Sequence, residues 1–260
     1  MRRKGILILM MLLCMGGILF SGYRMYGILT EYRTGTDTYD EMEQYALIDG
    51  TPADGETSAP AETESMPEET SPATATFPTV DFEALWKVNP DVAAWIYIPD
   101  TQIHYPIVQG KNNKVYLKKM IDGTRNAAGS IFMDYRNDRG FTDVHTMVYG
   151  HHMKNGSMFA GLTKYKSQDY YQAHPTILLV TPEEQIYYDI VAAYVAKPSG
   201  KTWTLTFADQ TELEDWLAFT QTKSAITTSV TPDVDDQFLS LATCSYEFDD
   251  ARFVVVAVRR

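Results

Sequence analysis

The fold is decided by two apolar stretches near the C-terminus, Leu239-Ser240-Leu241-Ala242-Thr243-Cys244 and Arg252-Phe253-Val254-Val255-Val256-Ala257-Val258. Both are rich in the apolar and β-branched residues typical of buried strands. A short acidic turn separates them, which predicts an antiparallel pair. Similar short runs recur upstream at residues 95–98, 103–108, 129–134, 146–149, 177–181 and 185–196. About eight short strands with few helices predict a mostly-β barrel.

Helical spacing is confined to a few segments around these strands. Residues 82–89 follow a potential cap at Asp81, and residues 209–223 place Leu213, Trp216 and Leu217 on one face. Shorter helical pieces are expected at residues 112–120 and 158–162. The barrel should therefore carry an N-terminal helix and peripheral helices.

The N-terminus predicts a membrane anchor. Arg2, Arg3 and Lys4 precede an uncharged apolar run at residues 5–22. A helix of that length rises roughly 27 Å, which is just enough to cross the hydrocarbon core. A cleaved signal peptide is the alternative, although Ser21-Gly22 is a weak cleavage site. The basic residues predict a cytoplasmic N-terminus, a single span and an exported C-terminal domain.

The negative charge lies mostly in a linker. The net charge is −12, and residues 31–80 hold twelve acidic residues and one basic residue. Residues 49–79 are mostly Thr, Ser, Ala, Pro and Glu, a composition that predicts a disordered spacer. We therefore expect an anchor at residues 1–30, a linker at residues 31–80 and a globular domain at residues 81–260. Because the charge gives no basic footprint, no nucleic-acid partner is expected.

Cys244 is the candidate nucleophile. The only other cysteine, Cys14, lies in the apolar run, so no disulfide within the exported domain is expected. A free thiol there is either a small buried hydrophobe or a reactive group. Among the five histidines, His151 and His152 follow a strand end and a glycine, where a side chain can face a cleft.

Arg252 is the third candidate for the site. Two antiparallel strands would bring it near Cys244, where a guanidinium could stabilise an oxyanion. The alternative is an edge arginine paired with Asp249 or Asp250. There is no zinc-ligand spacing and no phosphate-binding glycine loop, so neither a metal nor a cofactor is expected.

Together these motifs resemble the sortases, the transpeptidases of Gram-positive-type bacteria, and class B most closely. The resemblance covers residues 81–260. Ser240 departs from it, because the family usually has Thr there. The matching motifs are Trp95-Ile96-Tyr97-Ile98, Tyr105-Pro106-Ile107-Val108-Gln109, Asn113 with Tyr116-Leu117, Gly129-Ser130-Ile131-Phe132-Met133-Asp134, the run from His145 to Lys154 that contains Tyr149-Gly150-His151, Leu241-Ala242-Thr243-Cys244, Tyr246-Glu247-Phe248 and Arg252.

The resemblance implies an eight-stranded sortase-type barrel with a catalytic Cys244, a general acid/base His151 and an Arg252 that holds substrate and oxyanion. It implies an extracellular enzyme that cleaves the C-terminal sorting signal of secreted proteins through a thioacyl intermediate. A peptidoglycan-precursor amine is the implied acceptor, and residues 209–230 are expected to form part of the groove. Further expected substrate-binding residues are Asn113, Leu117, Tyr149, Thr243 and Glu247.

Three alternatives remain open at this point. A cysteine peptidase would release the product by hydrolysis, and a pilin-polymerising sortase would join protein subunits. A non-catalytic anchored binding module would keep its function when Cys244 is replaced.

Overall fold

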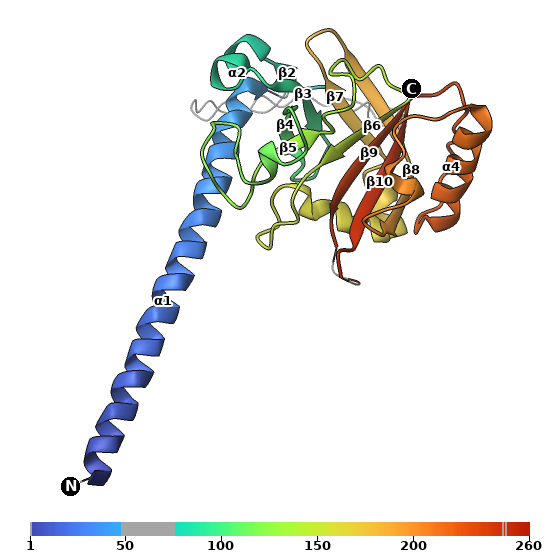
Figure 1. Cartoon of the computed structure of the whole chain (residues 1–260). Coiled ribbons are helices and arrows are strands. Elements are labelled where there is room, and N and C mark those ends of the chain that lie inside the picture. The colour runs from blue at the N-terminus through green and yellow to red at the C-terminus, as the bar shows by residue number, and fades with distance from the viewer. Residues whose placement is uncertain (1, 48–75, 246, 248) are drawn as a thin grey trace, which may run out of the picture.

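The core of the molecule is a closed eight-stranded barrel in the order β10-β8-β7-β3-β4-β5-β6-β9 (Figure 1). The computed structural model describes residues 2–47, 76–245, 247 and 249–260. The prediction of an eight-stranded barrel is confirmed. The barrel strands are β3 (Val92–Tyr97), β4 (His104–Val108), β5 (Ile131–Met133), β6 (His145–Tyr149), β7 (Thr176–Val180), β8 (Gln185–Ala196), β9 (Phe238–Cys244) and β10 (Arg252–Arg259).

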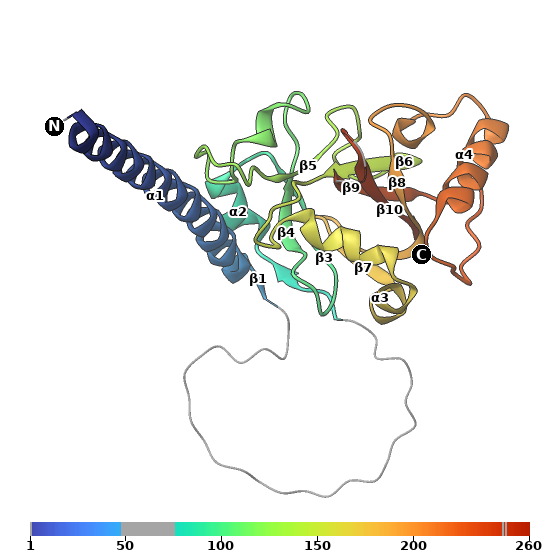
Figure 2. The same ribbon diagram turned by 90° about the horizontal axis from the view of Figure 1, so that it is seen from below.

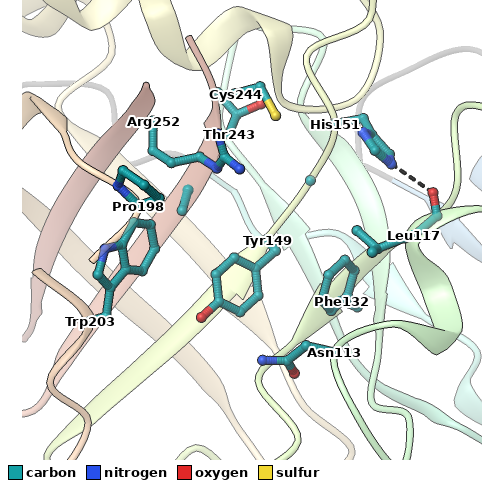
Figure 3. A pocket seen from close by; sticks show the side chains of 12 residues that line it. Asn113, Leu117, Phe132, Tyr149, His151, Pro198, Trp203, Thr243, Cys244 and Arg252 are labelled. Atoms are coloured by element: carbon teal, nitrogen blue, oxygen red, sulfur yellow. Dashed lines mark hydrogen bonds between the residues drawn. The ribbon is translucent and has the colours of Figure 1, made fainter. Parts of the chain in front are cut away.

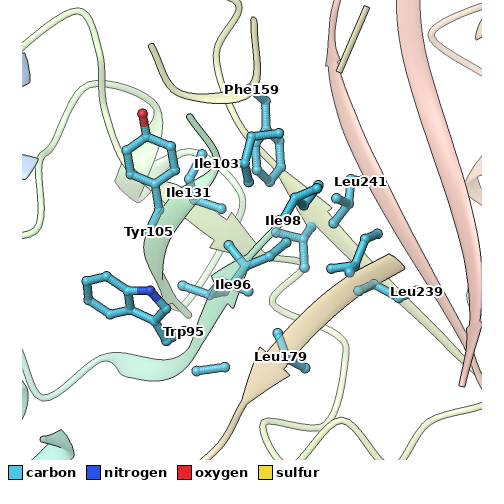
Figure 4. Close-up of a cluster of buried hydrophobic side chains, with 14 of the residues drawn as sticks. Trp95, Ile96, Ile98, Ile103, Tyr105, Ile131, Phe159, Leu179, Leu239 and Leu241 are labelled. Atoms are coloured by element: carbon cyan, nitrogen blue, oxygen red, sulfur yellow. The ribbon is translucent and has the colours of Figure 1, made fainter. Parts of the chain in front are cut away.

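The two opening stretches pack on both faces, as their pattern predicts. In β9, Leu239 and Leu241 belong to the barrel's main core, and Phe238 and Ala242 belong to a second core. Strand side chains alternate between faces, so one strand can serve both cores. Figure 4 shows Leu239 and Leu241 beside side chains from other strands. The second core lies between the barrel and α4 (Gln210–Lys223), where Trp216 is buried.

The short helices begin where the sequence offers a cap. Asp81 accepts a hydrogen bond from Ala84 N at 2.9 Å and starts α2 (Phe82–Val88). Asp209 caps α4 in the same way, through Glu212 N at 2.9 Å. The remaining short helices are α3 (Gln168–Ala173) and the 3-10 helices η1 (Glu43–Tyr45), η2 (Val115–Leu117), η3 (Phe159–Lys166) and η4 (Lys201–Trp203). Thus residues 112–120 contain only one 3-10 turn instead of the expected helix.

The longest helix, α1 (Arg2–Met42), projects away from the barrel (Figures 1 and 2). It is long and apolar enough to cross a membrane. Its C-terminal end packs on the barrel, where Tyr39 and Met42 are buried in the main core together with Ala46. Residues 31–47, which the sequence assigns to the linker, are therefore ordered by apolar burial against the barrel.

The acidic segment at residues 48–75 lies outside the described residues, so the prediction of disorder stays a prediction. Its flanks form a two-stranded sheet in which β1 (Ala46–Leu47) pairs with β2 (Thr79–Val80). The two flanks of the segment therefore lie side by side, and α1 connects the apolar run to the barrel directly.

A buried histidine packs beside the second core. His145 Nδ1 lies 2.6 Å from Thr204 O, and His145 Nε2 lies 2.8 Å from Ser240 Oγ. Because a carbonyl only accepts, Nδ1 carries the proton and Nε2 accepts from the Ser240 hydroxyl. The ring of His145 also packs against Trp216, with ring centroids 4.6 Å apart. Burial lowers the pKa of His145 to about 4, so the folded state excludes the charged imidazole.

We expect acid to destabilise the fold through His145. The unfolded histidine takes up a proton near pH 6.5 and the folded one only near pH 4, so stability is lost as the pH falls between these values. Denaturant titrations at pH 7 and pH 4 should show a loss about 3 kcal/mol smaller in His145→Gln than in the unmodified chain. His174→Gln, at a partly buried histidine, is the control and should keep the full loss. Equal losses in all three proteins would contradict the assignment.

Candidate active site

Strand pairing brings three expected site residues to one edge of the barrel. β6 runs parallel to β9, with Tyr149 opposite Ala242. Gly150 N continues the ladder by donating to Ala242 O at 3.1 Å. His151 and Cys244 each come two residues after this pair. β10 is antiparallel to β9 and places Arg252 directly opposite Cys244.

These residues line one cavity of about 390 Å³ (Figure 3). Figure 3 shows Cys244 between the other two, with its sulfur on the side of His151. Four of the five expected substrate-binding residues line the same cavity. The complete lining is Asn113, Leu117, Phe132, Tyr149, Gly150, His151, Pro198, Trp203, Ala242, Thr243, Cys244 and Arg252.

The glycine before His151 is required by close packing. A Cβ at Gly150 would lie 2.5 Å from Ile131 Cδ1 and 2.7 Å from the Phe159 ring. A larger residue at this position would force Ile131, Phe159 or the end of β6 to shift. His151 therefore starts from a tightly held backbone position.

The His151 ring is oriented by a main-chain carbonyl. Its Nε2 lies 2.6 Å from Leu117 O, and only a protonated nitrogen can donate to that oxygen. In the neutral ring the lone pair is therefore on Nδ1, which is the nitrogen available for proton transfer. His152 instead lines two neighbouring depressions and is absent from the lining of this cavity.

Arg252 is held by carbonyl groups. Its Nη1 donates to Asp250 O at 2.9 Å and to Ala251 O at 3.0 Å. Within the described part of the chain its guanidinium has no carboxylate partner within 4.0 Å. Instead of the alternative pairing with the Asp249 or Asp250 side chain, Arg252 makes backbone contacts, which leave its charge beside the cavity uncompensated by those side chains.

Cys244 is partly exposed and carries a free thiol. Cys14 is also a free cysteine. The described residues contain no group of three or more His, Cys, Asp or Glu side chains placed to hold a metal ion.

Glu247 is the expected substrate-binding residue that the structure places elsewhere. It lies in a neighbouring depression with Lys166 and Ser245. It accepts hydrogen bonds from both, and these hold the pKa of its carboxyl down at about 2. The acidic turn directs this side chain toward η3 and away from the cavity.

The expected contribution of residues 209–230 to the groove also differs from what the cavity lining shows. Residues 209–230 contribute nothing to the cavity lining, because α4 packs on the second core instead. Pro198 and Trp203, from the preceding part of the same connection, line it. Trp203 stacks on Tyr149 with ring centroids 6.2 Å apart, and its Nε1 donates to Lys197 O at 2.9 Å.

Asp134 supports the cavity from behind, and the sequence analysis missed this role. Its Oδ2 accepts from Asn113 Nδ2 at 2.8 Å and from Tyr149 OH at 3.0 Å. Arg136 forms two further hydrogen bonds with the same carboxylate, each at 2.9 Å. Burial raises the pKa of Asp134, but hydrogen bonds from Arg136, Asn113 and Tyr149 outweigh it and hold the pKa below its usual value.

The site combines a thiol, an imidazole and a guanidinium beside a largely apolar cavity. These are the residue types of a thiol-dependent acyl-transfer site, which needs a nucleophile, a proton carrier and an oxyanion partner. The fold and the site together are those of a β-barrel protein with a thiol-dependent acyl-transfer type of site.

Comparison with known proteins agrees with this class. A family model described as the Sortase domain matches residues 96–260. Sortase B of Listeria monocytogenes is 39% identical over 165 residues, which are 64% of this chain and 67% of that protein. Sortase B of Staphylococcus aureus is 33% identical over 178 residues, 68% of this chain and 73% of that protein.

Solved structures agree as well. The crystal structure of S. aureus sortase B superimposes with a TM-score of 0.66 at 32% identity, covering 69% of this chain and 86% of that one. Sortase B from B. anthracis gives a TM-score of 0.71 at 30% identity, covering 89% of this chain and 99% of that one. The chain therefore belongs to the sortase family of cysteine transpeptidases, and these relatives are all sortases B.

We expect Asp134→Asn to weaken the fold and the cavity together. The amide would set an N–H group against donors from Arg136, Asn113 and Tyr149, so the free energy of unfolding should fall by about 1–3 kcal/mol. Denaturant titration measures that loss. Asp235→Asn removes the same charge from an exposed position and should change stability by less than about 0.5 kcal/mol. Equal effects of the two variants would contradict a supporting role for Asp134.

Proposed function

We propose that the protein is a membrane-anchored transpeptidase that joins secreted proteins to a peptidoglycan-precursor amine. The observation that carries the proposal is the meeting of Cys244, His151 and Arg252 around one cavity. In this proposal the three act as nucleophile, general acid/base and oxyanion partner. Asn113, Leu117, Tyr149 and Thr243 contact the sorting-signal peptide.

The first half-reaction cleaves the peptide. The Cys244 thiolate attacks the carbonyl carbon of a Thr-Gly or Thr-Asn type bond and forms a C–S bond. The oxyanion of the tetrahedral intermediate accepts hydrogen bonds from Arg252. When the C–N bond breaks, His151 gives its proton to the departing amine. The product is a thioester on Cys244 and a released C-terminal fragment.

The second half-reaction forms the new amide. The nitrogen of the acceptor amine attacks the thioester carbon while His151 takes up its proton. The C–S bond then breaks and returns the Cys244 thiolate. Solved structures of sortase B include a substrate complex of the S. aureus protein and a complex with triglycine. By analogy, we propose that both a peptide and an amine reach the cavity of this chain.

The cellular location is part of the same proposal. The apolar part of α1 forms a single membrane span, with the basic N-terminus in the cytoplasm and residues 81–260 outside the cell. The positive charges before the apolar run and the length of α1 support this topology.

We expect a covalent adduct on Cys244. The full chain in detergent, carrying Cys14→Ser so that one thiol remains, is incubated with peptides containing Thr-Gly or Thr-Asn bonds. Intact mass spectrometry should show a gain equal to the N-terminal acyl fragment. Cys244→Ala should give no adduct and no cleavage with an unchanged fold. Absence of an adduct with every peptide would rule out the covalent mechanism.

The same experiment separates transfer from hydrolysis. Added triglycine should convert the adduct to an amide product, with the hydrolysed peptide as a minor product. Water as the only productive acceptor would identify a cysteine peptidase instead. A product formed only with the lysine side chain of a protein subunit would identify a pilin-polymerising enzyme.

We expect Arg252→Lys to slow acylation. Lysine keeps the charge but cannot hold the Asp250 and Ala251 carbonyls while presenting further donors to an oxyanion. The rate of adduct formation should fall by about a hundredfold, which is the usual cost of losing one oxyanion donor. Arg259→Lys, at the far end of β10, is the matched control and should keep the rate. Wild-type rates in Arg252→Lys would remove the arginine from the mechanism.

A further inference from the structure

The end of α1 contacts the segment that shapes the catalytic cavity. Tyr39 is 4% exposed, and its hydroxyl donates to Gly129 O at 2.6 Å. The same hydroxyl lies 3.1 Å from Ser130 Oγ. Burial raises the pKa of Tyr39 above its usual value, so the hydroxyl keeps its proton and remains a donor. These contacts fix the residues at the start of β5 to the helix.

Ser130 and Asn126 in turn hold the backbone on both sides of Leu117. Ser130 N donates to Tyr116 O at 3.0 Å, and Ser130 Oγ donates to Lys119 O at 2.9 Å. Asn126 N donates to Lys118 O at 3.1 Å. The carbonyl of Leu117 lies between these three and is the one that accepts from His151.

Gly129 packs tightly against the backbone of residues 116–117. Gly129 has φ +57°, and a Cβ there would lie 2.6 Å from Tyr116 O and 2.7 Å from Leu117 O. A shift of Gly129 or Ser130 would therefore move the Leu117 carbonyl directly.

A second set of contacts connects Tyr39 to the backbone of His151. The Tyr39 ring packs edge-on against Tyr105, with centroids 5.5 Å apart. The Tyr105 hydroxyl accepts from Met158 N at 3.0 Å, and the next residue, Phe159, donates its N–H to His151 O at 3.0 Å. Both the ring and the backbone of His151 thus connect to Tyr39 through a few short contacts.

A second contact from α1 holds the same segment. Asn126 Nδ2 donates to Glu31 O at 2.8 Å, and Ala127 N donates to Glu31 Oε1 at 2.9 Å. Glu31 and Tyr39 lie about two turns apart on the helix. Residues 126–130 are therefore held at both ends by the part of α1 that follows the apolar run.

We propose that Tyr39 is a positioning residue for His151. Through Gly129 and Ser130 it holds the Leu117 carbonyl where that oxygen selects the Nε2–H tautomer and keeps Nδ1 for proton transfer. The membrane-proximal helix is then a working part of the catalytic domain. The catalytic consequence rests on the role proposed above for His151, whereas the tautomer is independent of it.

The test compares Tyr39→Phe with the unmodified full chain in detergent. The variant loses one hydroxyl and keeps the ring that fills the core. Nitrogen-15 NMR of the labelled histidines reports the tautomer of His151, with His151→Gln identifying its signals. We expect the Nε2–H form in the unmodified chain and a mixture of tautomers in Tyr39→Phe. The kcat of transfer should fall about tenfold with KM within twofold, because a misplaced proton carrier slows chemistry and leaves binding intact.

Tyr32→Phe is the matched control, since Tyr32 lies two turns earlier on the same helix and is only partly buried against the core. It should leave both the tautomer and the kcat unchanged. Ser130→Ala, which removes the link to Lys119 O, should reproduce the effect of Tyr39→Phe. An unchanged His151 tautomer in Tyr39→Phe, or an equal change in Tyr32→Phe, would overturn the proposal. If the unmodified chain acylates no peptide, the proposed function fails, and the tautomer comparison still decides the role of Tyr39.

Discussion

The parallel pairing of β6 with β9 is the constraint on which the site depends. A shift of one residue in a strand turns every side chain to the opposite face. Such a slip would exchange Leu239 and Leu241 for Phe238 and Ser240 in the main core. It would also move Cys244 by one residue along β9 relative to His151. Burial on both faces of β9 makes the slip costly, so packing far from the cavity fixes the relative positions of His151 and Cys244.

The cavity is backed by polar groups that have no contact with solvent. Asp134 holds the wall formed by Asn113 and Tyr149, and His145 holds the connection that carries Trp203. A buried polar group is stable only when all its partners are in place. Each of these groups therefore favours one arrangement of the wall over many similar ones. Such preorganisation lets a site stabilise charge without rearranging during the reaction.

The sequence was sufficient for the local elements, and it singled out Cys244, His151 and Arg252 as candidates, which line one cavity. Alternation and turn residues predicted the strands, and Asp81 and Asp209 marked two helix starts, because these signals act within a few residues. A mostly-β barrel followed from the series of short strands, whereas the sortase-type barrel and the choice of His151 over His152 came with the family resemblance. Patterns in sequence carry little information on contacts between distant segments. The features that the sequence analysis missed depend on such contacts.

Three of the differences have the same physical origin. Tyr26, Leu29 and Tyr32 recur every three residues, but the sequence alone does not show that α1 continues to the barrel and buries Tyr39 there. Asp134 appears as the last residue of a strand motif, and the cavity residues that it holds, Asn113 and Tyr149, lie 21 and 15 positions away. Glu247 is three residues from Cys244, and its direction depends on Lys166, which is 81 positions away.

The small sheet formed by β1 and β2 changes the meaning of the acidic segment. Because β1 and β2 are paired, the chain enters and leaves this segment at one place, and α1 alone links the apolar run to the barrel. The entropy of closing such a loop grows only with the logarithm of its length, so doubling it would cost about 0.6 kcal/mol. The length of the segment between β1 and β2 therefore has little effect on the stability of the domain, whereas the length of α1 sets how far its apolar N-terminal part lies from the barrel.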